Sequence, residues 1–130
     1  MRKQQGFTVI EIIVVIAFLA TVGVLFFVQR GNLAASQRDD NRKVAINAMY
    51  YSLEEVFYTK NGYYPTKIDS KTLLSVDPNL FADPNGVKIG ESDSNYRYEG
   101  EACDGEKCKG YVLRADLERE DDYVKTNRTR

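Results

Sequence analysis

The chain has 130 residues, a net charge of −1, no histidine and two cysteines. This length accommodates one modest domain, and the near-neutral charge gives no global field that would favour nucleic acid or an acidic polymer as a partner. Without histidine the chain lacks the commonest general base, the usual partner of a serine or cysteine nucleophile, and the usual metal ligand, so its composition does not favour an enzyme.

The first predicted element is an apolar helix over residues 7–28, FTVIEIIVVIAFLATVGVLFFV. At about 1.5 Å per residue it reaches about 33 Å, which is enough to cross a bilayer core of about 30 Å. Arg2 and Lys3 precede it and predict a cytoplasmic N-terminus with the rest of the chain outside. The run is too long for the apolar part of a cleaved secretory signal, and the QRG that follows it is a poor cleavage site.

Glu11 is the one charged residue within this apolar segment. A charge deep in a membrane span costs about 2.5–3.5 kcal/mol even on lenient scales. A plain membrane anchor is one interpretation, because Glu11 lies only about 6 Å from Phe7 along the helix axis and can reach the interface. The alternative is that Glu11 belongs to a specific processing and assembly signal.

The N-terminal sequence resembles the class III leader of type IV pilins and type II secretion pseudopilins. The match consists of the six-residue basic leader MRKQQG, the Gly6-Phe7 junction, Glu11 at the fifth position after it, and the unbroken apolar helix. The resemblance implies that a prepilin peptidase cuts between Gly6 and Phe7 and methylates Phe7. It also implies a homopolymer, an assembly ATPase acting through a membrane platform, and minor pilins as further partners.

The resemblance also suggests a task for the carboxylate. After the cut, Phe7 carries a new cationic amine, and Glu11 lies on the same helical face at i+4. Glu11 is then able to meet the amine of its own chain or of a neighbour, and a staggered subunit without that partner is disfavoured. Ala20 and Val28 stand where many family members have a glycine and a proline, so no local melting at a proline is predicted, although Gly23 can soften the helix.

The helical pattern continues through residues 29–62 as an amphipathic helix. Residues 36–43 are polar and are expected to form a solvated collar. Apolar residues at helical spacing then form one stripe that predicts core packing: Ile46, Met49, Tyr50, Leu53, Val56 and Phe57. No proline interrupts residues 7–60, so we expect one helix of about 80 Å that stops at Asn61-Gly62.

A turn after the helix adds to the resemblance. Asn61, Gly62, Tyr64 and Pro65 are similar to the Asn-Gly-x-Tyr-Pro turn found in major pseudopilins and related pilins. Together with the leader, the resemblance covers about the first half of the chain.

The remaining residues predict a small globular head over residues 63–117. Loops dominate residues 66–91, with a short helical turn expected at residues 70–76 and a short strand at residues 87–89. Residues 96–99 and 111–117 alternate and predict an antiparallel hairpin on the amphipathic helix. The expected fold class is therefore α+β, with a long N-terminal helix packed on a small antiparallel sheet. Residues 118–130 are dense in mixed charge and predict a mobile tail.

Cys103 and Cys108 enclose four residues at the end of this hairpin. If the head lies outside the membrane, oxidising conditions favour a disulfide between them over two reduced thiols. A two-cysteine metal site would need ligands that histidine does not supply here.

Carboxylates in the loops invite a calcium hypothesis, which the resemblance to major pseudopilins also suggests: Asp77, Asp83, Glu91, Asp93, Glu99, Glu101 and Asp104. No D-x-D-x-D-G loop is present, so solvated side chains are the favoured interpretation and no cofactor or metal ligand is predicted. Tyrosines of the head are able to stack on bases, but residues 61–130 carry eleven Lys or Arg against fourteen Asp or Glu, which weakens a nucleic-acid interpretation.

These observations predict a structural subunit of a type IV pilus-like filament used for adhesion, twitching motility or DNA uptake. The subunit is expected in the cytoplasmic membrane before assembly, with its N-terminus inside, and then in an extracellular or periplasmic filament. Two alternatives stay open. One is the major pseudopilin of a type II secretion system, and the other is a membrane-tethered extracytoplasmic binding module that never polymerises.

Overall fold

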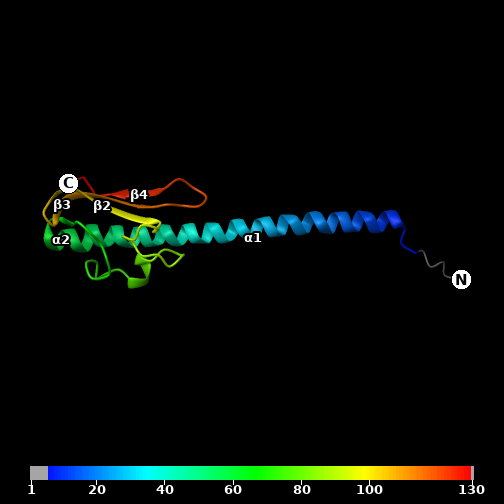
Figure 1. The fold of residues 1–130 in the computed structure, drawn as a ribbon, viewed down its shortest axis with the longest axis horizontal. Helices are drawn as coiled ribbons and strands as arrows, with labels where there is room; N and C mark the ends of the chain where they lie inside the picture. Colours follow the sequence, from blue (N-terminus) through cyan, green and yellow to red (C-terminus); the bar gives the residue numbers. More distant parts are fainter. Residues whose placement is uncertain (1–5, 130) are drawn as a thin grey trace. The chain divides into compact units, whose positions relative to one another are not determined.

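A computed structural model describes residues 6–129 as a long N-terminal helix and a small antiparallel sheet, which is an α+β fold (Figure 1). The helix runs as α1 (Val9–Tyr51), a π-helical turn η1 (Ser52–Phe57) and α2 (Tyr58–Asn61). It ends at Gly62, whose φ of 76° and N–H donation to the Tyr58 carbonyl at 2.7 Å form a glycine cap. The predicted continuous helix and its stop are confirmed. Apart from Gly6, the expected leader lies outside the described residues.

The chain divides into two compact units, an N-terminal unit, Met1–Ala35, and a C-terminal unit, Ser36–Arg130. The division falls inside α1, so the helix contributes to both units. The N-terminal unit holds the apolar segment, while every residue of the hydrophobic core belongs to the C-terminal unit.

The core of the C-terminal unit forms between the amphipathic part of the helix and the sheet, as the apolar stripe predicts. Ile46, Met49 and Leu53 are fully buried there. They meet buried residues of the sheet and the loops: Tyr64, Ile68, Leu73, Val76, Phe81, Tyr96, Tyr111 and Leu113. Val56 departs from the prediction and is half exposed, because η1 has π-helical rather than α-helical spacing and turns that position outward.

The sheet has four strands arranged around β3 (Lys107–Ala115). One side of β3 pairs with β2 (Tyr96–Asp104), and the other pairs with β1 (Tyr64–Pro65) and β4 (Tyr123–Thr126), all antiparallel. Tyr96 faces Ala115 and Cys103 faces Cys108, so the predicted hairpin is confirmed with longer strands than expected. Figure 1 shows β2, β3 and β4 alongside α2 and the neighbouring turns of the helix.

Two sequence-based expectations differ from the structure. The strand expected at residues 87–89 is reduced to a single bridge between Ala82 and Lys88, next to a 3-10 helix η2 (Pro78–Phe81). The described part of the expected mobile tail, residues 118–129, is instead folded, since β4 lies there and pairs with β3. Its charges, which indicated solvation, complement charges on α1, and its alternating YVKT sequence suits a strand.

Candidate assembly segment

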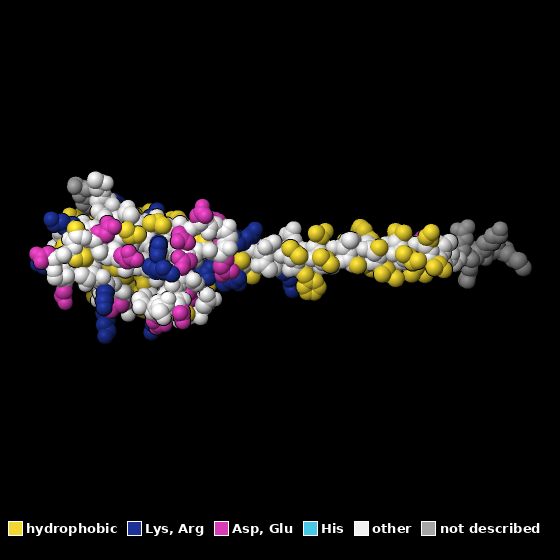
Figure 2. Space-filling view, turned by 45° about the horizontal axis from the view of Figure 1, so that its top comes forward, with side chains coloured by type: hydrophobic (Ala, Val, Ile, Leu, Met, Phe, Trp, Pro, Cys, Tyr) yellow, Lys and Arg dark blue, Asp and Glu magenta, His cyan; other side chains and the backbone are white. Residues whose placement is uncertain are grey.

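The apolar residues 7–28 of the N-terminal unit are uncovered by the described part of the chain. Phe7 is 80% exposed and Phe27 is 77% exposed, and the helical window of highest hydropathy, with a mean of 2.8, has no buried residue. On the face shown in Figure 2, hydrophobic side chains follow one another along this part of α1. The helix is long and apolar enough to cross a membrane. So large an exposed apolar surface marks a site for a membrane or for other protein chains.

The start of α1 is fixed by Thr8. The backbone N–H of Glu11 donates to the Thr8 hydroxyl at 3.3 Å and to the Thr8 carbonyl at 3.0 Å, which makes Thr8 the N-cap. Glu11 therefore lies in the first helical turn, where the helix dipole favours a carboxylate. Gly6 and Phe7 precede the helix and are exposed, so the predicted junction lies in non-helical chain.

The pairing of the Phe7 amine with Glu11 depends on the cut at Gly6-Phe7 and stays a prediction.

The hydroxyl of Thr21, further along the apolar segment, is satisfied locally. The Thr21 hydroxyl donates to the carbonyls of Ala17 and Phe18 at 3.0 and 2.8 Å. Just past the segment, the Arg30 guanidinium lies 5.1 Å from the ring centre of Phe26. Beyond Glu11, the segment therefore presents a continuous apolar exterior that suits hydrocarbon or close helix packing.

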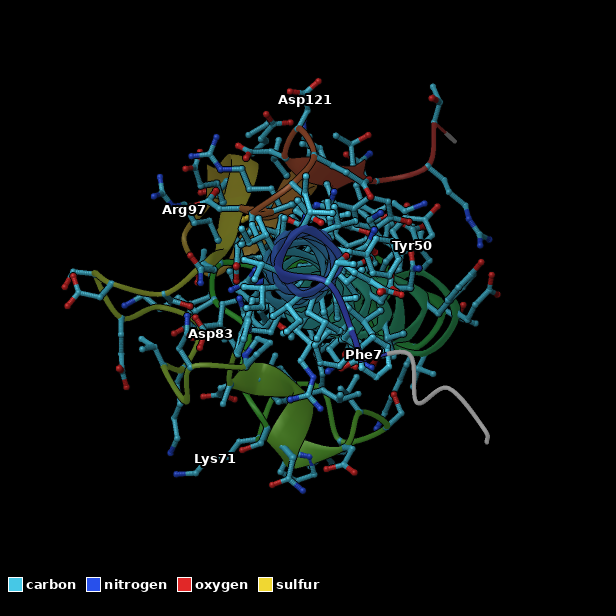
Figure 3. The ribbon with its side chains drawn as sticks, turned by 90° about the vertical axis from the view of Figure 1, so that its right-hand side faces the viewer. Phe7, Tyr50, Lys71, Asp83, Arg97 and Asp121 are labelled. Atoms are coloured by element: carbon cyan, nitrogen blue, oxygen red, sulfur yellow. A yellow bond between two sulfur atoms is a disulfide. The ribbon has the colours of Figure 1, made fainter. Side chains whose placement is uncertain are left out.

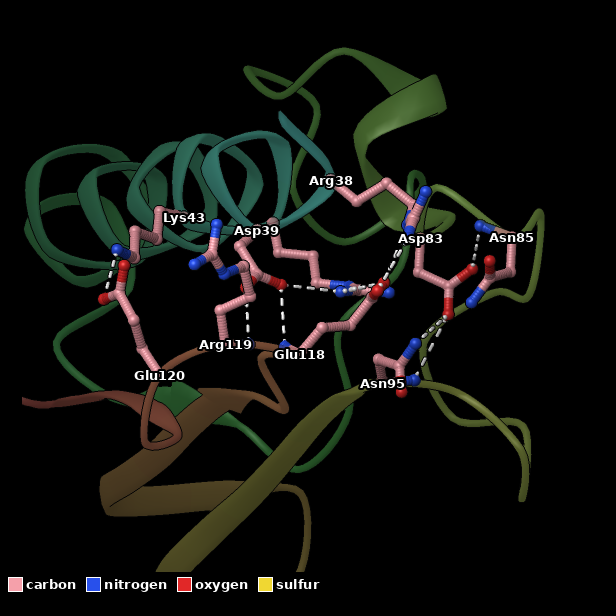
Figure 4. A network of polar contacts seen from close by, with 10 residues as sticks. Arg38, Asp39, Lys43, Asp83, Asn85, Asn95, Glu118, Arg119 and Glu120 are labelled. Atoms are coloured by element: carbon pink, nitrogen blue, oxygen red, sulfur yellow. Dashed lines mark hydrogen bonds and ion pairs between the residues drawn. The ribbon is translucent and has the colours of Figure 1, made fainter. Parts of the chain in front are cut away.

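The polar collar of residues 36–43 is not fully solvated, as the sequence suggested. Arg42 and Asp39 are buried, and their side chains form an ion pair at 2.8 Å. The same Arg42 nitrogen lies 2.9 Å from Glu118, which also receives two hydrogen bonds from Arg38 at 2.7 Å each (Figure 4). Burial is tolerated because each charge meets opposite charges at hydrogen-bond distance.

Residues 118–120 are held on α1 by this cluster. The Asp39 carboxylate accepts the backbone N–H groups of Glu118 and Arg119 at 2.9 and 3.0 Å. Lys43 pairs with Glu120 at 2.6 Å. Hydrogen bonds from Arg38 and Arg42 lower the pKa of Glu118 to about 2. The sequence analysis did not predict this cluster. The sequence feature that indicates it is a pair of arginines, Arg38 and Arg42, four residues apart on one helix face. The mixed-charge segment that begins at Glu118 supplies the complementary carboxylate.

A second buried carboxylate, Glu54, sits in the π-helical turn. It accepts the hydroxyls of Tyr64 and Tyr111 at 3.1 and 3.0 Å, and the backbone N–H of Arg128 at 3.2 Å. Burial, together with the Glu54 carboxylate, raises the pKa of Tyr111 well above its usual range. Glu54 therefore joins the helix, β1, β3 and the C-terminal segment, and nothing in the local sequence pattern singles it out.

The predicted disulfide between Cys103 and Cys108 is present. It bridges paired residues of β2 and β3, with Cys108 buried and Cys103 exposed. A Cβ atom built at Gly100 would lie 2.5 Å from the Cys108 sulfur and 3.0 Å from the Cys103 sulfur. The disulfide therefore packs directly on the backbone of β2, and only glycine fits at position 100.

Two of the loop carboxylates, Asp77 and Asp83, hold the backbone. Asp83 is buried and accepts from the backbone N–H groups of Asn85 and Val87 at 2.8 and 3.0 Å, and from the Asn95 side-chain amide at 3.0 Å (Figure 4). Asp77 accepts the backbone N–H of Asn79 at 2.9 Å and starts η2. Within residues 6–129, no group of three or more Asp, Glu or Cys side chains is placed to hold a metal ion.

No family model, curated protein or solved structure matches this chain. The uncovered apolar helix, together with the sequence resemblance at its N-terminal end, is therefore the basis for a proposal of function. The cluster around Arg42 and the carboxylate of Glu54 lie within the C-terminal unit and hold its parts together.

Proposed function

We propose that this chain is a structural subunit of a type IV pilus-like filament. A prepilin peptidase cuts it between Gly6 and Phe7 and methylates Phe7, and the subunit then polymerises through residues 7–28. Its partners are further copies of itself, minor pilins, and an assembly ATPase acting through a membrane platform. The chain does no catalysis of its own.

The observation that carries the proposal is the contrast between the two units. The C-terminal unit buries its own apolar side chains, whereas residues 7–28 bury none of theirs. A surface of this kind needs a second environment, which is the membrane for the precursor and neighbouring helices for the filament. Thr8 supports the proposal, because it begins the helix immediately after the junction and places Glu11 in the first turn.

Glu11 sets the register in this proposal. The amine freed at Phe7 is a cation, and Glu11 is the charge within the apolar segment that is able to meet it in its own chain or in a neighbour. An apolar bundle tolerates the carboxylate only where that cation lies close, so subunits in the wrong stagger are disfavoured.

Mass spectrometry of the mature N-terminus tests the processing step. We expect a chain that begins at methylated Phe7. An intact Met1, or a cut beyond Val28, would contradict the proposal and favour the membrane-tethered binding module.

Filament yield tests the assembly step. Glu11→Ala is expected to abolish filaments seen by electron microscopy while leaving the cut at Gly6-Phe7 intact. Asp121→Ala, which removes an exposed carboxylate outside residues 7–28, serves as the control and is expected to assemble. Filaments at normal yield in Glu11→Ala would show that the carboxylate does not set register.

The major pseudopilin of a type II secretion system is the second candidate. The turn formed by Gly62, Tyr64 and Pro65 favours it, because it matches the Asn-Gly-x-Tyr-Pro pattern. Electron microscopy of cells with and without the gene separates long surface pili from a short periplasmic filament.

A further inference from the structure

The outer edge of β2 carries no neighbouring strand among residues 6–129. β3 lies on one side of β2, while β1 and β4 both pair with β3 and not with β2. β2 is also long, with nine residues against two in β1 and four in β4. A strand edge of this length is able to pair with a further extended segment.

Alternate residues of β2 direct their backbone groups away from the sheet. The Asp116 N–H donates to the Asn95 carbonyl at 2.9 Å, so these two residues form a hydrogen-bonded pair. Hydrogen-bonded and non-hydrogen-bonded positions alternate in an antiparallel pair. The odd-numbered residues of β2 therefore bond to β3, and the even-numbered residues direct their N–H and carbonyl groups outward.

Two of the outward positions, Tyr98 and Gly100, are open to another chain. Within residues 6–129 they form no backbone hydrogen bond outside the sheet. The third outward position, Tyr96, already donates its N–H to the Ser94 hydroxyl at 3.1 Å. Regular strand geometry is interrupted at Ala102, whose φ is 49°. The edge that another chain is able to use therefore covers residues 97–101.

An open groove lies beside the first half of this edge. It has a volume of about 710 Å³ and is lined by residues 96–99, residues 66–69 and residues 89–92. Ile68, Ile89 and Tyr98 are among its lining residues, and they belong to or pack against the hydrophobic core. The Tyr98 hydroxyl donates to a backbone carbonyl, that of Pro65, at 2.7 Å, which holds this part of the wall in place. The groove therefore suits an apolar side chain on the Tyr98 face of an added strand.

The opposite face of the edge carries three charged side chains at alternate positions. Arg97, Glu99 and Glu101 are exposed, and the pleat places them on the face of β2 that Tyr98 does not share. Arg97 extends outward from the sheet, and its contact with Asp116 is a long ion pair of 3.5 Å (Figure 3). In sequence order the edge thus displays one positive charge followed by two negative charges.

We propose that this edge binds an extended segment of another protein, in which charged and apolar residues alternate. The pairing is antiparallel, which is the more stable arrangement per residue. From its N-terminus the segment then reads basic, apolar, basic, apolar, acidic. Its basic residues lie opposite Glu101 and Glu99, and its acidic residue lies opposite Arg97. The apolar residue opposite Tyr98 enters the groove.

The charge pattern selects both the register and the partner. Opposite charges directly across a strand pair stabilise it and like charges destabilise it, so the three positions act together. No five-residue segment of the 130-residue sequence has the complementary pattern, read in either direction. The occupant is therefore a different protein and not a second copy of this chain. The proposal goes beyond filament assembly and does not depend on the cut at Gly6-Phe7 or on Glu11.

Peptide binding to the full chain in detergent micelles tests the backbone pairing. The probe is a fluorescein-labelled peptide with the core sequence Lys-Val-Lys-Val-Glu, and fluorescence anisotropy measures its Kd. The matched control has the same core with both valines N-methylated, because the valine N–H groups would donate to the carbonyls of Tyr98 and Gly100. We expect saturable binding of the probe and a Kd about tenfold higher for the methylated peptide. No binding of the probe, or an equal Kd for the two peptides, would overturn the proposal.

Charge exchange tests the register. Glu99→Lys is expected to raise the Kd of the probe about tenfold, since it places like charges opposite one another. Changing the central lysine of the probe to glutamate should restore tight binding to this variant. Glu106→Lys, which alters an exposed carboxylate in the turn between β2 and β3, is the matched control and should leave the Kd unchanged. If the exchanged peptide bound Glu99→Lys no better than the probe does, the proposed register would be wrong.

Amide hydrogen exchange locates the bound peptide. Binding is expected to slow exchange at the N–H groups of Tyr98 and Gly100, which become hydrogen-bonded. Binding without this protection would overturn the proposal, because the peptide would then lie elsewhere. Protection of these amides before any peptide is added would overturn it too, because a second copy of the chain would then already cover the edge. Each of these outcomes leaves the experiments on processing and filament yield to be decided separately.

Discussion

The guanidinium of Arg42 lies 2.9 Å from the carboxylate of Glu118, which is 76 residues further along the chain. Arg42 is buried, and its second carboxylate partner is Asp39. The cluster joins the first turns of the C-terminal unit to residues near its end, so the stability of that unit depends on charges that the sequence places far apart.

Asp39→Asn is expected to destabilise the C-terminal unit by about 3 kcal/mol, because removing one partner leaves a buried cation undercompensated. It also weakens the acceptor for the Glu118 and Arg119 N–H groups. Thermal unfolding followed by tyrosine near-UV circular dichroism measures the loss. Asp40→Asn, an exposed neighbour, is the matched control, and equal stability of the two variants would contradict the assigned role.

The pH dependence of stability follows from the lowered pKa of Glu118, about 2 against an ordinary value of 4.5. A carboxyl whose folded-state pKa is depressed contributes stability above the unfolded value and loses it as pH falls through the folded value. We therefore expect the wild-type chain to lose stability between about pH 4.5 and pH 2. Glu118→Gln should be less stable at neutral pH and should fall less steeply in this window. If the free energy of unfolding fell with pH at the same slope in both proteins, the prediction would be contradicted.

Tyr111→Phe removes one of the donors to the buried Glu54 carboxylate. We expect a loss of about 1–3 kcal/mol in the free energy of unfolding, since a buried acceptor loses a hydrogen bond. Tyr63→Phe is the control, because no hydrogen bond of its hydroxyl is recorded within residues 6–129. Urea titration compares the free energies of unfolding of the two variants. If Tyr111→Phe were as stable as the wild-type chain, the other hydrogen-bond donors to Glu54 would be enough to stabilise its carboxylate.

Gly100→Ala places a methyl group where the disulfide packs. Overpacking of this kind costs about 1–3 kcal/mol. The penalty should shrink when Cys103 and Cys108 are both replaced by alanine, because the sulfur atoms are then absent. A double-mutant cycle of unfolding free energies measures this coupling. An unchanged penalty in the alanine background would assign the effect to the backbone of β2 rather than to the disulfide.

The features that the sequence predicts correctly depend on patterns among residues that are close together in the chain. The helix from Val9 to Asn61 follows from an uninterrupted run without proline, and the burial of Ile46 and Met49 follows from their spacing. The hairpin of β2 and β3 follows from alternation, and the disulfide from two cysteines at its end.

The features that the sequence does not predict depend on contacts between residues that are far apart in the chain. Asp39 and Arg42 are predicted to be solvated because their partner Glu118 is far along the chain. Residues 118–130 are predicted to be disordered because a local pattern does not include the opposite charges on α1 that pair with them. Glu54 is hidden for another reason. A π-helical turn changes the spacing of the stripe, and α-helical periodicity does not anticipate it.

The bond between the Arg128 N–H and Glu54 also has a consequence for biogenesis. The two residues are 74 positions apart, and the intervening chain supplies the loops and all four strands. Glu54 leaves the ribosome long before Arg128 is synthesised, so its carboxylate stays incompletely partnered while the chain emerges. Contacts this distant in sequence form slowly, and the C-terminal unit therefore completes its folding only after residue 128 has been translated.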